Sequence, residues 1–90
     1  HKGTIETAYT IMNGEYEVIE AEIIETSELI NKELKNSNLP DEIRIGAVLR
    51  ENKVIIPRSN FVFQKEDKVV FLAKKDSISV VENIFRISSI

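Results

Sequence analysis

The sequence contains no cysteine and no tryptophan, and its single histidine stands at position 1. The lack of cysteine excludes disulfide bonds, thiolate metal sites and cysteine nucleophiles. The lack of further histidine removes the usual general base and the usual zinc ligand. Glycine occurs three times and proline twice, and there is no glycine-rich phosphate loop. No apolar run reaches the roughly 20 residues of a membrane-spanning helix, and no signal peptide opens the chain.

The composition is that of one small globular domain. Of the 90 residues, 42% are hydrophobic and 30% are charged, which is a balance that supports a packed core. The net charge of −3 argues against sequence-independent binding of nucleic acid, since phosphates require a basic surface. The scattered aromatic residues are interpreted as core. We expect a single domain over 1–90, and the absence of an initial methionine suggests that it is part of a longer protein.

A β-hairpin is predicted at the beginning of the chain. The segment 3–12 is rich in β-branched and aromatic residues, and the segment 15–25 alternates apolar and acidic side chains. Between them stands Asn13-Gly14, a dipeptide typical of two-residue turns because both positions need a positive φ. Residues 1–14 are therefore expected to be a lead-in strand with its turn.

A short helix and a second hairpin are predicted next. Residues 26–34 combine capping residues with an apolar stripe at helical spacing, and the asparagines and proline of 36–40 end this helix. The segments 43–50 and 53–57 then flank a two-residue turn.

The last third predicts a strand and a C-terminal helix. Residues 69–73 are all apolar, so this strand is either central in its sheet or covered by a partner. Residues 76–85 place their apolar side chains on one helical stripe. The order hairpin, helix, hairpin, strand, helix predicts an α+β fold, in which an antiparallel sheet of hairpins carries a short middle helix and a C-terminal helix.

The second hairpin can be divided into two faces. Arg50 is expected to pair with Lys53 across the turn, and Val48 then lies opposite Ile55. One face is predicted to be core and contains Ile43, Ile45, Ala47, Leu49, Val54 and Ile56. The other face is predicted to carry cations around a small apolar patch.

Three hypotheses follow for this basic face, and all stay open on these patterns: a ligand pocket, a surface that pairs two subunits, and cations that only balance acidic neighbours. Converging cations over an apolar floor would hold the phosphate of a nucleotide-like ligand. The candidate ligand-binding residues are Arg44, Arg50, Lys53 and Arg58. A self-complementary surface would instead pair two subunits, which the sequence favours over a pocket. The candidate dimer-interface residues are Val48, Arg50, Lys53, Ile55, Val70 and Leu72.

Neither a metal site nor a catalytic site is expected. Glu20 and Glu22 share one face of a strand, but no loop supplies the six or more oxygen ligands that calcium prefers, so a solvated face is expected. No serine has a histidine partner. Fifteen acidic residues in 90 make accidental carboxylate pairs inevitable, and we therefore predict that the domain is not an enzyme.

Several stretches together form a recognisable pattern. They are Leu39-Pro40, Ile45-Gly46-Ala47-Val48-Leu49-Arg50, Val54-Ile55-Ile56-Pro57, Asp67-Lys68-Val69-Val70-Phe71 and Val81-Glu82-Asn83-Ile84-Phe85. This pattern resembles the TrkA C-terminal domain, also called the C-terminal lobe of RCK (regulator of K⁺ conductance) units. The opening of the chain is similar to the lead-in of the last such domain in bacterial potassium-uptake regulators. Asn31 and Glu66 stand where that family usually has glycine.

The resemblance implies a cytoplasmic regulatory domain, peripheral to the inner membrane, that dimerises and passes ligand-dependent movement to a potassium channel subunit. It implies that NAD or ATP/ADP binds only in a separate Rossmann-like lobe, so no cofactor is expected in this chain. It also leaves a second possibility, a nucleotide- or cation-sensing module attached to another ion or anion transporter. Expected partners are a second copy and a membrane channel subunit, and no nucleic acid.

Overall fold

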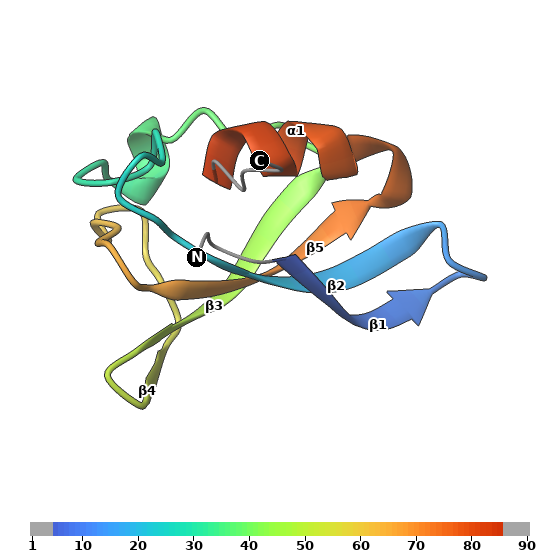
Figure 1. Cartoon of the computed structure of the whole chain (residues 1–90), viewed down its shortest axis with the longest axis horizontal. Coiled ribbons are helices and arrows are strands. Elements are labelled where there is room, and N and C mark those ends of the chain that lie inside the picture. The colour runs from blue at the N-terminus through green and yellow to red at the C-terminus, as the bar shows by residue number, and fades with distance from the viewer. Residues whose placement is uncertain (1–4, 86–90) are drawn as a thin grey trace.

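The computed structural model describes residues 5–85, which form one antiparallel sheet with a helix packed on it (Figure 1). The five strands are β1 (Ile5–Ile11), β2 (Tyr16–Glu22), β3 (Ile43–Arg50), β4 (Lys53–Ile55) and β5 (Lys68–Lys74). The helix is α1 (Ile78–Phe85), and two short 3-10 helices are η1 (Leu34–Asn36) and η2 (Lys75–Ser77). The strands follow the order β1-β2-β5-β3-β4. The predicted α+β class is confirmed.

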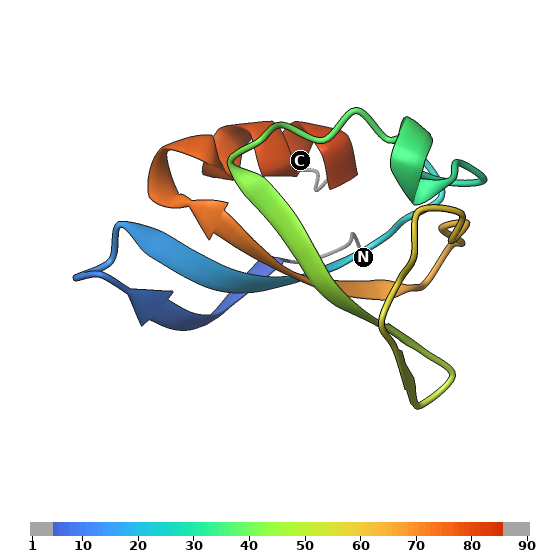
Figure 2. The ribbon, with the colours of Figure 1, turned by 180° about the vertical axis from the view of Figure 1, so that it is seen from behind.

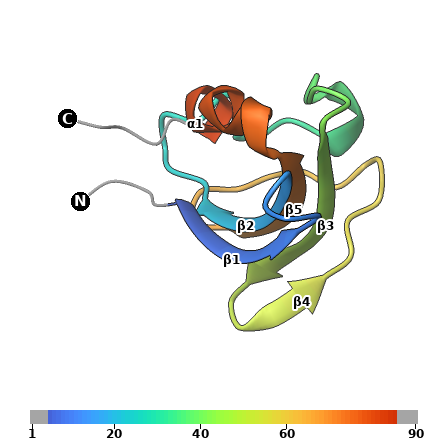
Figure 3. The same ribbon diagram turned by 90° about the vertical axis from the view of Figure 1, so that its right-hand side faces the viewer.

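β5 is the central strand, as its apolar sequence predicted. It pairs with β2 on one side and with β3 on the other. Its side chains at 69, 71 and 73 are buried on the face that α1 covers, where Phe71 stacks on Phe85 of the helix with ring centroids 5.2 Å apart. Burying this face against one amphipathic helix gives the domain a single core (Figure 3).

The first hairpin forms, but its turn is longer than predicted. Ile11 pairs with Tyr16, which leaves four residues in the turn instead of two. Met12 and Asn13 have φ values of 57° and 58°, and Gly14 has a φ of 90°. The left-handed backbone expected at Asn13 and Gly14 is present, and it begins one residue earlier. Residues 1–4 of the predicted lead-in lie outside the described residues.

The predicted middle helix is wrong, because residues 26–36 form turns that end in η1. Asn31 has a φ of 66°, which no α-helix tolerates in its interior. The backbone of this segment bonds to a distant one: Asn31 N–H donates to the Phe63 carbonyl at 2.9 Å, and Leu34 N–H donates to the Phe61 carbonyl at 2.8 Å. Long-range pairing therefore replaces the hydrogen bonds of a helix.

Ser27 ties this segment to the end of α1. Its buried hydroxyl donates to the Ile84 carbonyl at 3.0 Å and accepts from the Leu29 N–H at 3.1 Å. The carbonyl of Ile84 lies in the last turn of the helix, where intrahelical donors are lacking. The serine thus satisfies the helix end and fixes the loop above the core.

The division of β3 into two faces is corrected by a β-bulge. The register against β5 shifts between Ile45 and Ala47, so one extra residue reverses the alternation from there on. Val48, predicted to be on the outer face, is fully buried in the core. Val54 and Ile56, predicted to be core, are 69% and 72% exposed. The predicted pairs Arg50–Lys53 and Val48–Ile55 are confirmed.

The sheet face opposite α1 is not covered by any element of the described chain (Figure 3). Its central rows, defined by the strand register, combine apolar and charged residues that are half-buried or exposed: Val18, Glu20, Arg44, Ala47, Val70 and Leu72. Beyond this face the hairpin of β3 and β4 projects from the body of the domain (Figure 2). Among residues 5–85, no helix is long and apolar enough to cross a membrane.

Candidate functional site

An ion pair between Arg50 and Asp67 closes the base of the projecting hairpin. Arg50 Nε donates to Asp67 Oδ1 and Arg50 Nη2 donates to Asp67 Oδ2, both at 2.7 Å. The carboxylate is 1% exposed and also accepts the Gln64 N–H at 2.9 Å. Two parallel bonds of this kind fix direction as well as distance. The pair therefore joins the end of β3 to the turn that precedes β5.

The guanidinium of Arg50 has further partners. Its Nη2 also donates to the Val62 carbonyl at 2.9 Å, and its central carbon lies 4.8 Å from the centroid of the Phe61 ring. The hydrogen bond to Asp67 raises the pKa of Arg50 above its ordinary value, while desolvation opposes this effect. Arg50 therefore stays charged and internally engaged, which suits a structural role.

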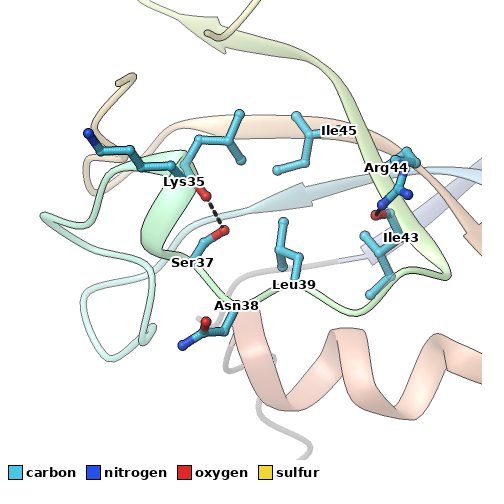
Figure 4. Close-up of a pocket in the computed structure, with 8 residues that line it drawn as sticks. Lys35, Ser37, Asn38, Leu39, Ile43, Arg44 and Ile45 are labelled. Atoms are coloured by element: carbon cyan, nitrogen blue, oxygen red, sulfur yellow. Dashed lines mark hydrogen bonds between the residues drawn. The ribbon is translucent and has the colours of Figure 1, made fainter. Parts of the chain in front are cut away.

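A groove of about 330 Å³ lies between η1 and the start of β3 (Figure 4). Its lining residues are Leu34, Lys35, Ser37, Asn38, Leu39, Ile43, Arg44 and Ile45. We call it the η1–β3 groove. The close-up shows Leu39 and Ile45 extending into the space between the two walls, with Lys35 and Arg44 on opposite sides.

Local structure holds the walls of this groove. Ser37 Oγ donates to the Leu34 carbonyl at 2.6 Å, and Asn38 takes a left-handed φ of 55° that redirects the chain toward β3. Arg44 Nη1 lies 3.4 Å from the Ile43 carbonyl, so most of its donors face outward. Aliphatic side chains beneath two cations can receive a planar apolar group and an anionic group together.

The structure separates the four residues predicted to bind an anionic ligand. Arg44 lines the η1–β3 groove, whereas Arg50 is bound to Asp67. The bulge of β3 places these two side chains on opposite faces of the strand. Lys53 lies opposite Arg50 on the hairpin, and Arg58 is exposed after the hairpin. A convergent cluster of these four cations is therefore not formed in the described chain.

The six residues predicted for a dimer interface are also distributed. Val48 is part of the monomer core and Arg50 belongs to the ion pair with Asp67. Ile55 is half-buried against the core, and Lys53 is exposed beside it on β4. The other two, Val70 and Leu72, lie on the uncovered sheet face of β5.

Asp67 is the buried polar residue that the sequence interpretation did not single out as functional. A usable signal was present: an arginine ends one apolar strand, and an aspartate immediately precedes another. A charged residue at the end of a buried apolar strand is partly removed from water and needs a partner of opposite charge. This combination therefore favours an ion pair. The acidic residues of β2 give no comparable cluster, and no group of three possible metal ligands occurs within residues 5–85.

The sequence is similar to a known domain family and to proteins of known name. The family model of the TrkA-C domain matches residues 18–86. The chain is 39% identical over 87 residues to the Trk system potassium uptake protein TrkA of Azorhizobium caulinodans, covering 97% of this chain and 19% of that protein. It is 38% identical over 64 residues to a TrkA homolog of Archaeoglobus fulgidus, covering 71% of this chain and 15% of that protein. The chain thus spans less than a fifth of the length of these relatives.

Comparison with solved structures points to the same fold. The RCK_C domain dimer of S. agalactiae BusR in complex with c-di-AMP superposes with a TM-score of 0.68. The match covers 77% of this chain and 95% of that domain, at 24% sequence identity. The arrangement of sheet and C-terminal helix is therefore shared with a solved RCK_C domain.

Proposed function

The chain belongs to the TrkA-C domain family, and on this basis we propose that it is the regulatory, self-associating C-terminal domain of a Trk-type potassium uptake protein. The observation that carries the proposal is the match of residues 18–86 to the family, together with 39% identity to a TrkA protein over nearly the whole chain. In this proposal the domain lies in the cytoplasm beside a membrane channel subunit. It performs no chemistry and holds no cofactor of its own.

The mechanism we propose is a shift between two arrangements of paired domains. Two packings that differ by a few kcal/mol respond to any ligand that binds one of them better. The domain itself is suited to transmit such a shift as a rigid body, since the Arg50–Asp67 ion pair and Ser27 fix its loops to its core. Movement would then occur between copies and reach the channel subunit.

Potassium uptake by the full-length protein tests this function. In cells that lack other potassium uptake systems, deletion of the segment 18–86 is expected to reduce regulated uptake of potassium or rubidium by tenfold or more. A surface substitution on α1, Val80→Lys, serves as the control and is expected to leave uptake unchanged, because Val80 is 39% exposed. Uptake that is unaffected by the deletion would contradict the proposed role.

A second candidate function, sensing of a ligand by this domain itself, is favoured by the η1–β3 groove. The groove combines an aliphatic floor with Lys35 and Arg44, which suits a nucleotide-like anion. The BusR domain of similar fold was solved with c-di-AMP, so a cyclic dinucleotide is a suitable probe. This sensing function would also serve a domain attached to another transporter.

Calorimetric titration of the 90-residue chain with c-di-AMP, ATP and inorganic phosphate tests the groove. Arg44→Glu is expected to weaken binding of the recognised probe at least tenfold, since the substitution replaces attraction by repulsion at the wall of the groove. Lys65→Glu is the matched control, because Lys65 is an exposed cation outside the groove. Equal losses in both variants, or no binding of any probe by the unmodified chain, would refute sensing at this groove.

A further inference from the structure

Within residues 5–85, no strand pairs with the outer edge of β4. The strand stands last in the sheet order, and its hairpin projects from the domain (Figures 1 and 2). Its turn residues Glu51 and Asn52 have φ values of 52° and 65°, which defines a tight two-residue hairpin. A strand in this position presents main-chain donors and acceptors to any strand that lies beside it.

The register shows which main-chain groups are available. In a two-residue hairpin the pair next to the turn, Arg50 and Lys53, is hydrogen-bonded, so the following pair with Val54 is not. The N–H and C=O of Val54 therefore point away from β3. β4 ends at Ile55, and we extend the same alternation by two residues, which places the N–H and C=O of Ile56 outward as well. On this extension Pro57 takes an inward position, where its missing N–H removes no donor from the outer edge.

The side chains of the same two residues are unusually exposed for their type. Val54 is 69% exposed and Ile56 is 72% exposed, and both lie on one side of the hairpin. Natural edge strands are usually protected by charges or by covering segments. Here the residues with available main-chain groups are also large and apolar.

We propose that β4 pairs with β4 of a second copy, antiparallel, about a two-fold axis at Ile55. This inference rests on the self-association proposed above and specifies its surface. Val54 of each copy then forms a hydrogen-bonded pair with Ile56 of the other, which makes four main-chain hydrogen bonds. The four exposed side chains meet on one face, and the two sheets become one continuous sheet.

The charges of the hairpin fit this register. Lys53 of one copy lies opposite Pro57 of the other, so no like charges meet directly. The turn residue Glu51 approaches Arg58 of the second copy, which is a pairing of opposite charges. A register centred on Val54 instead would pair that residue with itself and bring Ile56 against the polar turn. An isologous contact centred on Ile55 is the one that uses both available residues.

Disulfide trapping tests the register, and the lack of native cysteine makes any introduced thiol unique. In the proposed pair, the Cα atoms of the two Ile55 residues are about 4.5 Å apart, within disulfide range. The two Val54 residues are diagonal neighbours about 7–8 Å apart, outside it. Under mild oxidation, Ile55→Cys is expected to form covalent dimers at least tenfold faster than Val54→Cys. Random collision would favour the more exposed position 54, so the reverse order would overturn the proposal.

Ile55 packs against the core, so its substitution can also affect folding. A second test therefore changes other residues and measures the mass of the particle by light scattering. The double variant Val54→Lys/Ile56→Lys is expected to halve the mass measured for the unmodified chain, while Val80→Lys leaves it unchanged. Both substituted residues are exposed, so circular dichroism is expected to show a folded domain. A double variant that remains dimeric would refute the β4 contact alone. An unmodified chain that is monomeric at every concentration would refute self-association itself.

Discussion

Asp67 is the residue on which three separate segments depend. Its carboxylate is nearly inaccessible and binds Arg50 of β3 and the backbone of Gln64. Its main chain adds another contact, since the Asp67 carbonyl accepts the Ile23 N–H at 2.8 Å. A buried carboxylate that is bound on both oxygens stabilises a fold only as long as its cation remains.

Asp67→Asn is therefore expected to lower the free energy of unfolding by roughly 2–4 kcal/mol, because it leaves the Arg50 charge without its counter-ion. Part of the full effect of a buried pair is lost to solvent, since Arg50 is 24% exposed. Urea unfolding monitored by circular dichroism measures this. Lys65→Gln, at an exposed position in the preceding turn, is the control and is expected to change stability by less than about 0.5 kcal/mol. Equal effects of the two substitutions would show that the ion pair is unimportant.

At the scale of single elements, the turn before β5 contains local strain. The Asp67 N–H donates to the Gln64 carbonyl at 3.2 Å, which closes a turn whose third residue is Glu66. Glu66 has a φ of 76°, a conformation that glycine adopts freely and that other residues adopt at a cost. The glutamate therefore holds a strained backbone at this turn.

Glu66→Gly is expected to raise the free energy of unfolding by about 0.5–1 kcal/mol, the balance of relieved left-handed strain and added freedom in the unfolded chain. This corresponds to a rise of a few degrees in Tm, measurable by thermal unfolding. Glu66→Ala removes the same charge but keeps a Cβ atom, so it is expected to give no increase. A similar rise in both variants would mean that charge, and not backbone strain, limits stability at this turn.

The elements also show how far sequence patterns could predict this fold. The apolar run of β5 predicted a central strand, and the stripe ending at Phe85 predicted α1, because both signals arise from burial within one element. Gly46, a glycine inside a strand pattern, indicates a bulge, but it does not specify the register against β5, and the bulge there exchanges the two faces of β3. The prediction of a middle helix was wrong for a related reason. The Asn31 N–H donates to the carbonyl of Phe63, more than thirty residues away.

The candidate site shows the same limit. Spacing along β3 suggested that Arg44 and Arg50 converge, since an unbroken strand would place both on one side. One extra residue between them sends Arg44 to the groove and Arg50 to Asp67. The predicted interface residues Lys53 and Ile55 lie on the hairpin of β3 and β4, and the exposure of Val54 and Ile56 was not predicted because it depends on the same reversal. Tertiary register, which no single segment encodes, decided each case.

At the scale of the whole molecule, the proposed functions use different parts of one rigid body. The η1–β3 groove opens beside the start of β3, and the proposed dimer contact lies at the far end of the same strand pair. Between them, β3 is held to β5 along most of its length. A ligand in the groove and a partner on β4 would therefore act on the two strands of one hairpin, which would connect the proposed sensing with the proposed assembly.

The strand order has a consequence for how the domain folds during its synthesis. β2 and β3 make no ladder with each other; each pairs with β5, which follows both in the sequence. During synthesis the hairpins β1–β2 and β3–β4 leave the ribosome before β5. Until β5 emerges, the edges of β2 and β3 that it will pair with have no partner strand. The sheet becomes complete only after Lys68–Lys74 has emerged and paired with both β2 and β3. A chain stalled before that point would expose two unpaired strand edges at once and become a substrate for chaperones.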